Sequence, residues 1–289
     1  MAARDSSVRA SPVWLVLAGI LSVQFGASVA KSLFDEVSPT TIVWLRLAAS
    51  ALVLMAIARP RMRGRTRDDW LVVLAFGLVL GLMNWAFYQS MARIPIGLAV
   101  TIEFVGPLSL AVLGSRRLRD LLWVGLAGTG VLLLGVQPGD LNWAGVGFAL
   151  LAGASWAAYI LLSAQTGRRW QGVDGLAVAS LIAVLLLSPL TLGRYADQLS
   201  DARILVLGAL VGLLSSAIPY TVELFALRSL RPAVFSILMS LEPAAAALSA
   251  LVVLGERLEP LQLLAMACVV AASVGATRSA ATISEPVPD

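Results

Sequence analysis

RIPIGLAVTIEFVGP, residues Arg93–Pro107, decides the fold of this chain, because it sets one carboxylate deep inside an apolar segment. The segment starts at a charge and a proline and continues to Gly114, with Glu103 near its middle. An ionisable group at the centre of a bilayer costs roughly 2.5–3.5 kcal/mol on insertion scales, so such groups face a cavity or a partner. Glu103 therefore predicts a buried polar environment within a membrane-spanning bundle.

A second stretch near the end of the chain repeats this pattern. LRPAVFSILMSLEP, Leu230–Pro243, carries Glu242 at a similar depth, and a proline closely follows each glutamate, Pro107 and Pro243. Proline removes a backbone donor and weakens a helix. Interrupted helices at corresponding places in two halves of a chain indicate a transport site. The alternative is a pair of protonated glutamates that are hydrogen-bonded inside a dry helix bundle.

Composition places the chain in the membrane class. Of its 289 residues, 59% are hydrophobic and 13% are charged, and the mean hydropathy is +0.88, which excludes an ordinary soluble domain. A single cysteine, Cys268, excludes an internal disulfide, and the absence of histidine removes the commonest metal ligand. We therefore expect no metal and no cofactor. The pI near 9.8 does not indicate nucleic acid, because the arginines lie in short loops between apolar runs.

We expect an all-α membrane protein with ten transmembrane helices, each about 20 residues long, which is the length that crosses the hydrocarbon core. The expected spans are Val13–Phe34, Pro39–Ala58, Trp70–Met91, Pro95–Gly114, Leu121–Val136, Leu141–Ala164, Leu176–Leu192, Ile204–Leu227, Pro232–Leu254 and Leu258–Thr277. The connections between these spans are short, and none of them is long enough to contain a soluble domain.

The distribution of basic residues sets the expected orientation. With the N-terminus in the cytoplasm, fifteen of the 21 Lys and Arg residues fall in cytoplasmic segments and four in outer ones. This asymmetry favours cytoplasmic N- and C-termini. Tryptophans near the expected span ends suit an aromatic belt; they are Trp14, Trp44, Trp70, Trp123, Trp143 and Trp170.

The two ends of the chain lie outside the expected bundle. Residues 1–12 form a cytoplasmic segment, and residues 278–289 form a short polar tail that we expect to be disordered. Residues 1–30 also resemble a signal peptide, with basic residues, an apolar run and small residues at Ser28 and Ala30. Because the run is long enough to span a membrane and cleavage would leave nine spans, we expect this segment to be retained.

The two halves of the chain, residues 13–136 and 141–277, echo each other weakly as two five-helix repeats. FYQSMARIP (Phe87–Pro95) aligns with LFALRSLRP (Leu224–Pro232), and a small gap then brings Glu103 into line with Glu242. Five spans per half is an odd number, so the second copy enters the membrane upside down. This is the inverted-repeat plan of secondary transporters, whose site lies near the midplane between the copies.

Polar side chains within the spans are the candidate binding residues. Lys31, the only lysine, lies near the outer end of the first span, where its ammonium either reaches the interface or binds substrate. Arg46 lies roughly 10 Å inside the second span, too deep to reach the interface easily, so we expect a carboxylate or backbone carbonyls as its partner. Gln24 adds an amide in the first span. Glu223 and Tyr220 are weaker candidates, and interface anchoring is the favoured role for Glu223.

Two further pairs of residues predict a cavity lined by amide and aromatic groups. Asn84 and Tyr88 lie one turn apart in one span, and Trp156 and Tyr159 lie three residues apart in another, so each pair can share a helix face. Such a cavity suits a small polar organic solute. Ordinary packing within the bundle is the alternative for each of these residues taken alone.

No sequence motif indicates an enzyme. The phosphate-binding loop GxxxxGK[ST] is absent, as are HExxH and any Cys/His cluster. A Ser–Lys dyad built on Lys31 is formally compatible with an intramembrane hydrolase, but no other feature of the sequence supports it. We therefore expect a protein that is not an enzyme.

Several stretches together resemble the ten-span EamA-type branch of the drug/metabolite transporter superfamily, and within it the bacterial inner-membrane threonine and homoserine exporters. The resemblance covers about Pro12 to Thr277. The stretches that carry it are GASVAKSLF (Gly26–Phe34), WLRLA (Trp44–Ala48), the run from Asn84 to Pro107, SRR (Ser115–Arg117), AIPYTVE (Ala217–Glu223), LMSLEPAAAA (Leu238–Ala247) and LGERLEPLQLLA (Leu254–Ala265).

This resemblance implies a secondary exporter of small hydrophilic amino acids in the bacterial inner membrane, with alternating access. We expect proton antiport to drive export, because a buried glutamate can carry the coupling proton. A zwitterion needs an anion for its ammonium, which Glu103 or Glu242 supplies. Its carboxylate needs a cation or a helix N-terminus, which Lys31, Arg46 or the free amides near a kinked helix supply. A broader efflux carrier for amphipathic metabolites or drugs is the alternative, and a non-transporting membrane sensor or assembly factor is the alternative of another class. A homodimer is left open.

Overall fold

The computed structural model describes residues 12–113, 120–134, 142–217, 219 and 232–281. Regular structure in this part of the chain is entirely helical. The elements are α1 (Pro12–Lys31), α2 (Pro39–Ala58), α3 (Arg67–Met91), α4 (Ile96–Glu103), α5 (Val105–Leu113), α6 (Asp120–Leu134), α7 (Trp143–Arg169), α8 (Asp174–Arg194), the 3-10 helix η1 (Ala196–Ser200), α9 (Ala202–Gly212), the π-helical segment η2 (Leu213–Ala217), α11 (Pro232–Met239), α12 (Glu242–Leu254) and α13 (Pro260–Ala281).

Helices in the described residues account for each expected span, wholly or in part. Seven stretches are long and apolar enough to cross a membrane, and Ile96–Leu110, Leu121–Val131 and Ala202–Ser215 are shorter apolar helices. Helix α13 continues to Ala281, so residues 278–281 are helical and not part of a disordered tail. The described part of the chain is therefore all-helical, and its long apolar helices are those of a multi-pass membrane protein.

Local sequence signals explain where several helices begin and end. The side chain of Thr66 accepts the amide of Asp69 and the Asp69 carboxylate accepts the amide of Thr66, which forms a capping box at the start of α3. Ser38 caps α2, whose first residue is Pro39, a favoured residue at that position. Helix α12 ends at Gly255, whose positive φ of 70° suits glycine.

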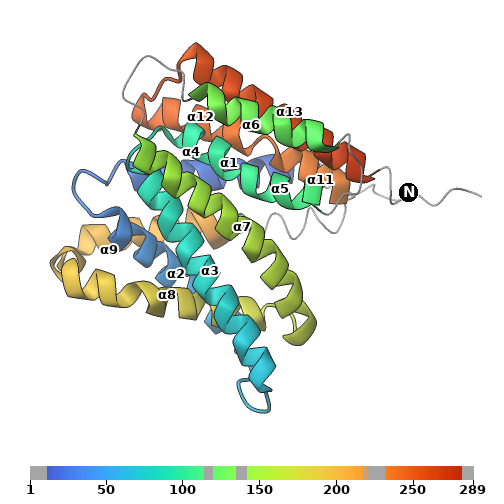
Figure 1. Cartoon of the computed structure of the whole chain (residues 1–289). Coiled ribbons are helices and arrows are strands. Elements are labelled where there is room, and N and C mark those ends of the chain that lie inside the picture. The colour runs from blue at the N-terminus through green and yellow to red at the C-terminus, as the bar shows by residue number, and fades with distance from the viewer. Residues whose placement is uncertain (1–11, 114–119, 135–141, 218, 220–231, 282–289) are drawn as a thin grey trace, which may run out of the picture.

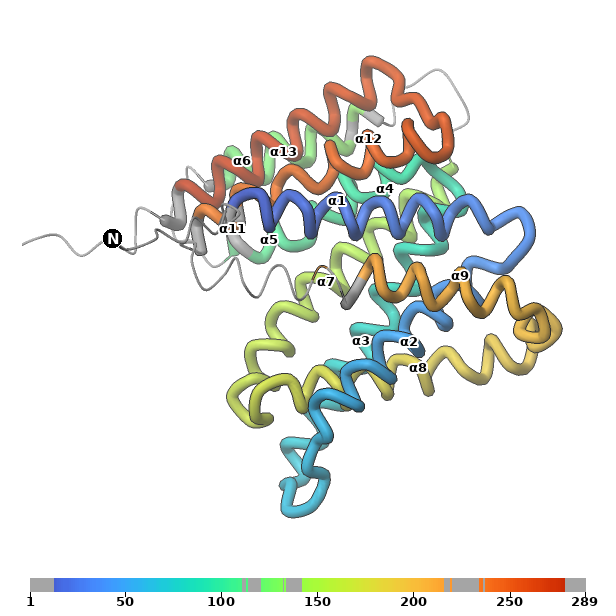
Figure 2. The backbone as a smooth tube through the Cα atoms, turned by 180° about the vertical axis from the view of Figure 1, so that it is seen from behind, coloured from blue at the N-terminus to red at the C-terminus, as the bar shows by residue number. Residues whose placement is uncertain are grey.

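The helices form two groups that face each other (Figure 1). One group contains α2, α3, α7, α8 and α9, and the other contains α1, α4, α5, α6, α11, α12 and α13. Figure 2 shows that the groups lie close together near the connection from α1 to α2 and diverge toward the end where α1 begins and α13 ends.

The two groups do not correspond to the two halves of the sequence, contrary to a simple reading of the expected repeats. The most extensive packing joins helices of different halves, such as α3 with α7 and α8, α6 with α13, and α1 with α12. Residues 13–136 and 141–277 are therefore interleaved in space. A site between the two helix groups therefore contains residues from both halves of the sequence on each of its sides.

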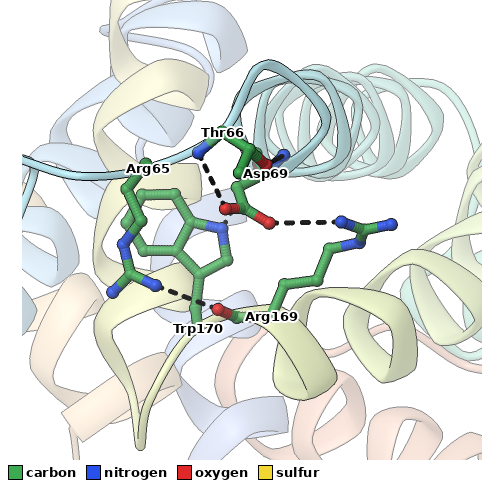
Figure 3. Close-up of polar contacts among 5 residues, drawn as sticks. All are labelled: Arg65, Thr66, Asp69, Arg169 and Trp170. Carbon is green, nitrogen blue, oxygen red and sulfur yellow. Dashed lines mark hydrogen bonds and ion pairs between the residues drawn. The ribbon is translucent and has the colours of Figure 1, made fainter.

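The start of α3 and the end of α7 are joined by a polar and aromatic cluster (Figure 3). The guanidinium of Arg65 donates to the carbonyl oxygen of Arg169 at 2.9 Å and lies 4.2 Å from the ring centroid of Trp170. Arg169 pairs with Asp69 at 3.2 Å, and the indole of Trp170 donates to the carbonyl of Asp69 at 3.3 Å. Trp170 is only 2% exposed, so its expected place in an aromatic belt is wrong. It is a packing centre because its ring is enclosed by these neighbours.

Candidate substrate-binding cavity

Both glutamates lie where a membrane helix is interrupted. Helix α4 ends at Glu103 and α5 begins at Val105. Phe104 between them keeps right-handed helical dihedrals and its amide still donates to the carbonyl of Val100 at 3.0 Å, so the helix is distorted here but not unwound. Pro107 has no amide proton, so the carbonyl of Glu103 lacks the donor that a regular helix would supply four residues later. The backbone break beside this carboxylate is therefore a direct consequence of the sequence EFVGP.

The second interruption is also caused by a proline, but its glutamate lies at the start of a helix and not at the end. Helix α11 ends at Met239 and α12 begins at Glu242, with Ser240 and Leu241 between them in a turn. Pro243 cannot donate to the carbonyl of Met239. Glu242 thus opens a helix, where free amides favour an acidic side chain, whereas Glu103 closes one.

Two glycines allow the first interruption to press against α7. A Cβ at Gly106 would overlap the carbonyl group of Gly153, and a Cβ at Gly153 would lie 2.6 Å from the carbonyl oxygen of Glu103. The backbones of α5 and α7 are therefore in direct contact at this crossing, which small residues permit. This contact fixes the depth at which Glu103 enters the space between the helix groups.

A cavity of about 550 Å³ lies between the two groups. Its walls come from α1, α2, α3, α4, α5, α7, α8, η2, α11, α12 and α13. The polar residues that line it are Gln24, Arg46, Ser50, Asn84, Glu103, Tyr159, Ser180, Ser215, Glu242, Ser273 and Thr277, and the aromatic lining also includes Phe87, Phe104, Trp156 and Phe235. The volume is within the range of about 300–1,000 Å³ that is usual for small-molecule sites.

Seven of the residues selected from the sequence line this cavity: Gln24, Arg46, Asn84, Glu103, Trp156, Tyr159 and Glu242. Glu103 is 9% exposed and Gln24 is 2% exposed, so both are enclosed by protein. The rings of Trp156 and Phe104 form a T-shaped pair with 5.0 Å between their centroids, next to the break that follows Glu103. Trp156 and Tyr159 thus occupy the same wall, as their spacing on α7 predicts.

Arg46 is the arginine that lines the cavity, and its partners among the described residues are weak. Its Nη2 lies 3.5 Å from the carbonyl oxygen of Ser215, at the outer limit for a hydrogen bond, and its Nε is buried without a hydrogen-bond partner. The guanidinium carbon lies 5.7 Å from the centroid of the Tyr88 ring. Arg46 forms no ion pair with any acid in the described residues. A guanidinium held in this way is available to an incoming anion.

Lys31 and Tyr88 do not line the cavity. The ammonium of Lys31 donates to the carbonyl of Ile94 at 2.8 Å and pairs with Glu256 at 2.5 Å, and the other carboxylate oxygen of Glu256 accepts the amide of Ile96 at 3.0 Å. The lysine thus ties the end of α1 to the start of α4 and the end of α12. Tyr88 is fully buried in the core. Of the two cations selected from the sequence, Arg46 lines this cavity and Lys31 does not.

Two other candidates, Glu223 and Tyr220, lie outside the described residues. Sequence reasoning missed the cavity-lining hydroxyls, among them Ser215 in η2 and Ser273 and Thr277 in α13. Serine and threonine are common in membrane helices and carry no periodic signal of their own. Only the break in regular helix at η2 separates Ser215 from many similar residues, and that break is not visible in the sequence.

The chain belongs to the EamA-like transporter family, because the model of that family matches residues 10–137 and again residues 143–278. It is 41% identical over 278 residues to the threonine/homoserine exporter RhtA of Escherichia coli strain K12, and 42% identical over 278 residues to the exporter of the same name from Salmonella typhimurium strain LT2. Each alignment covers 94% of this chain and 94% of the relative.

A solved crystal structure of a protein that is 18% identical has the same fold, with a TM-score of 0.63 over 95% of this chain and 99% of that chain. The family match, the relatives and the apolar helices together identify a multi-pass protein of the bacterial inner membrane. The resemblance to the exporter branch of the family, first noted in the sequence, is thereby confirmed.

Proposed function

We propose that this protein exports small hydrophilic amino acids of the threonine and homoserine type. One observation carries the proposal: Arg46, Glu103 and Glu242 all line a single cavity. A zwitterionic amino acid presents one anion and one cation, and this cavity offers the complement of both. The names of the relatives, which share 41–42% identity over most of their length, support the same class of substrate.

The proposed roles of the charged residues follow from the chemistry of their side chains. The planar guanidinium of Arg46 suits a carboxylate, which it can bind through two parallel hydrogen bonds. The substrate ammonium then binds on the side of Glu103 and Glu242, whose interrupted helices bring their carboxyl groups into the cavity. Asn84, Tyr159 and Trp156 complete the wall around the substrate.

Proton antiport is the proposed source of energy. A glutamate in an enclosed cavity gains or loses a proton as the cavity closes to water or opens, so one of the two acids can carry the coupling proton. The substrate ammonium competes with that proton for the same carboxylate. Substrate that binds from the cytoplasm thus releases the proton inward, and the empty carrier takes up another proton at the outer face.

The proposed topology has ten spans, two inverted repeats of five spans in residues 13–136 and 141–277, and both termini in the cytoplasm. The interruption of α4–α5 in the first repeat and of α11–α12 in the second supports the repeat, since both occupy the fourth span of their copy. With this orientation, the diverging end of the two helix groups faces the cytoplasm (Figure 2). Alternating access would then close that end and open the end that contains Lys31 and Glu256.

Counterflow of labelled threonine in proteoliposomes tests the function. Purified protein is reconstituted with unlabelled threonine inside, and uptake of label is followed with and without an imposed pH gradient. The proposal predicts uptake above that of protein-free liposomes and a change of net export rate when the gradient is reversed. Label that never exceeds the control level would refute amino-acid transport, and exchange that ignores the gradient would refute proton coupling.

A broader efflux carrier is a second candidate, which the aromatic wall favours. Trp156, Tyr159 and the phenylalanines in the lining would accept an amphipathic solute. Competition distinguishes the two candidates: hydrophobic cations should leave threonine counterflow unchanged if the cavity is built for amino acids. Inhibition by such cations at concentrations similar to that of threonine would favour the broader carrier.

A further inference from the structure

We infer that five exposed arginines at one end of the bundle bind the headgroups of anionic phospholipids and thereby stabilise the protein. These residues, which we call the arginine patch, are Arg59, Arg61, Arg63, Arg67 and Arg168. The inference goes beyond amino-acid export, because the patch is a surface that does not line the cavity. With the proposed orientation, this surface faces the cytoplasmic leaflet of the membrane.

The arginine patch combines two stretches that are far apart in the sequence. Four of its members lie between the end of α2 and the first residue of α3, and Arg168 lies in the last turn of α7. The guanidinium of Arg65 donates to the carbonyl of Arg169 at 2.9 Å, and Arg169 pairs with Asp69 at 3.2 Å (Figure 3). These contacts hold the connection from α2 to α3 against the end of α7, so the arginines of both stretches share one edge of the molecule.

The protein itself does not neutralise the patch. All five arginines are exposed, and within the described ranges none of their side chains forms an ion pair or a hydrogen bond. The neighbouring acid Asp69 pairs with Arg169, and Asp174 lies 3.9 Å from Arg65. Asp68 is exposed and offsets one of the five charges. An excess of positive charge therefore remains at this edge.

This excess equals the net charge of the entire chain. Residues 59–69 and 168–174 contain seven arginines and three aspartates, and seven minus three gives a net charge of +4. The complete chain has 21 Lys and Arg residues against 17 Asp and Glu residues, which is also +4. The other 14 basic residues are thus balanced by 14 acidic ones. Such a concentration of one sign attracts a partner of the opposite charge.

The position of the arginine patch indicates that this partner is a lipid surface. Helices α2 and α3 are both long and apolar enough to cross a membrane, and their connection lies at an extremity of the molecule in both views (Figures 1 and 2). Ile57 is 71% exposed and Trp70 is 39% exposed, only a few residues from the patch. In a membrane these side chains contact acyl chains and the interface, so the guanidinium groups beyond them lie at the level of the headgroups.

The chemistry of the patch favours anionic headgroups over zwitterionic ones. Clusters of about four to eight basic residues directly beside a membrane helix are typical of binding to anionic lipids. The planar guanidinium donates two parallel hydrogen bonds to phosphate oxygens. Phosphatidylglycerol has a net negative charge, whereas the choline of phosphatidylcholine cancels the charge of its phosphate. Each basic residue near an anionic surface strengthens the attraction about fivefold.

Thermal unfolding of the full-length protein in neutral detergent measures this binding. The apparent Tm is recorded while the mole fraction of phosphatidylglycerol or of phosphatidylcholine in the mixed micelles is increased. We expect phosphatidylglycerol to raise the Tm more than phosphatidylcholine does. About 0.5 M NaCl should remove most of that difference, because salt screens exposed charges. Inorganic phosphate at the same concentration as the lipid should not reproduce the effect.

Two double variants that each remove two exposed positive charges provide the matched comparison. Arg61→Gln with Arg63→Gln changes the patch, and Arg194→Gln with Arg257→Gln changes the opposite end of the bundle, where α8 and α12 end. The patch variant should need at least about tenfold more phosphatidylglycerol for a half-maximal rise in Tm, and the control variant should need the same amount as wild type.

Several outcomes would overturn the inference. They are equal stabilisation of wild type by the two lipids, an unchanged requirement for phosphatidylglycerol in the patch variant, and an equal rise in Tm with inorganic phosphate, which would make a soluble anion the partner. If the patch variant does not fold, the wild-type protein still decides, because an effect of phosphatidylglycerol that salt leaves unchanged is not electrostatic. Threonine counterflow tests the proposed function separately, so either can fail without the other.

Discussion

Replacing Gly153 by alanine should disturb the cavity through the backbone of Glu103. The new Cβ would lie 2.6 Å from the carbonyl oxygen of Glu103 and 3.3 Å from its carbonyl carbon and Cα. Ordinary van der Waals contact begins at 3.4 Å, so the end of α4 must move away from α7 by about 0.8 Å. Because these atoms are backbone, no side-chain rotation can relieve the overlap.

Gly147 provides a matched control on the same helix, because a Cβ at this position would meet nothing within 4 Å. Alanine in place of glycine favours a helix by about 1 kcal/mol at either site. At Gly153 alone, overpacking opposes that gain with about 1–3 kcal/mol. The unfolding free energies of Gly153→Ala and Gly147→Ala should therefore differ by about 1–3 kcal/mol, or about 2–4 °C in apparent Tm for each kcal/mol.

Two measurements on purified protein check this prediction. Thermal unfolding in detergent should place Gly153→Ala below Gly147→Ala, and threonine counterflow should weaken in Gly153→Ala alone, because the displaced carboxylate no longer matches the substrate ammonium. If Gly153→Ala is as stable and as active as Gly147→Ala, the close crossing of α5 and α7 does not set the position of Glu103 and our reasoning is wrong.

Four other substitutions test single contacts in the cavity and elsewhere in the bundle. Lys31→Met and Glu256→Gln should each lower the unfolding free energy by about 1–3 kcal/mol, because each leaves the opposite charge unpaired on a side chain that is only 18–19% exposed. The double variant should lose less unfolding free energy than the two single variants together, which a double-mutant cycle of thermal unfolding measures. Arg46→Lys should raise the KM for threonine about tenfold or more with little change in stability, because an ammonium cannot bind a carboxylate in the two-bond geometry; an unchanged KM would argue against Arg46 as the carboxylate site. Thr66→Ala should lower the unfolding free energy by about 1 kcal/mol through loss of the capping box, and it should leave threonine counterflow unchanged.

Much of the fold could be predicted from the sequence, because apolar runs of membrane length leave few alternatives to helices. Pro39–Ala58 was predicted as a helix at the bounds that the structure has. The breaks after Glu103 and before Glu242 follow from Pro107 and Pro243, which remove specific backbone donors. The ten spans, their orientation and the inverted repeat remain proposals.

The grouping of the helices could not be predicted in the same way. Hydropathy shows which segments are apolar. Because every membrane helix has an apolar surface, hydropathy does not show which helices pack against each other. The close crossings depend on single small residues such as Gly153 and Gly106, and these do not differ in sequence from the other glycines in the helices. The interleaving of the two halves emerges only from the three-dimensional packing.

The residues of the candidate site also divide into those that the sequence could predict and those that it could not. Glu103, Glu242 and Arg46 were identifiable because charge inside an apolar run is costly and therefore conspicuous. Lys31 carries the same signal, but an ion pair with Glu256 accounts for it, and only the structure could distinguish the two cases. Ser215 gives no such signal. A serine inside an apolar helix has little free-energy cost, because its hydroxyl can donate a hydrogen bond to a backbone carbonyl of the same helix.

Exchange of labelled threonine by the Glu103→Gln protein tests the central claim most directly. The amide keeps the shape of the side chain and removes its charge and its exchangeable proton. Glu259→Gln, a change of an exposed glutamate at the start of α13, serves as the control. We predict that Glu103→Gln reaches the membrane in normal amounts and loses exchange, while Glu259→Gln retains the wild-type rate. A wild-type rate of exchange in Glu103→Gln would contradict the account.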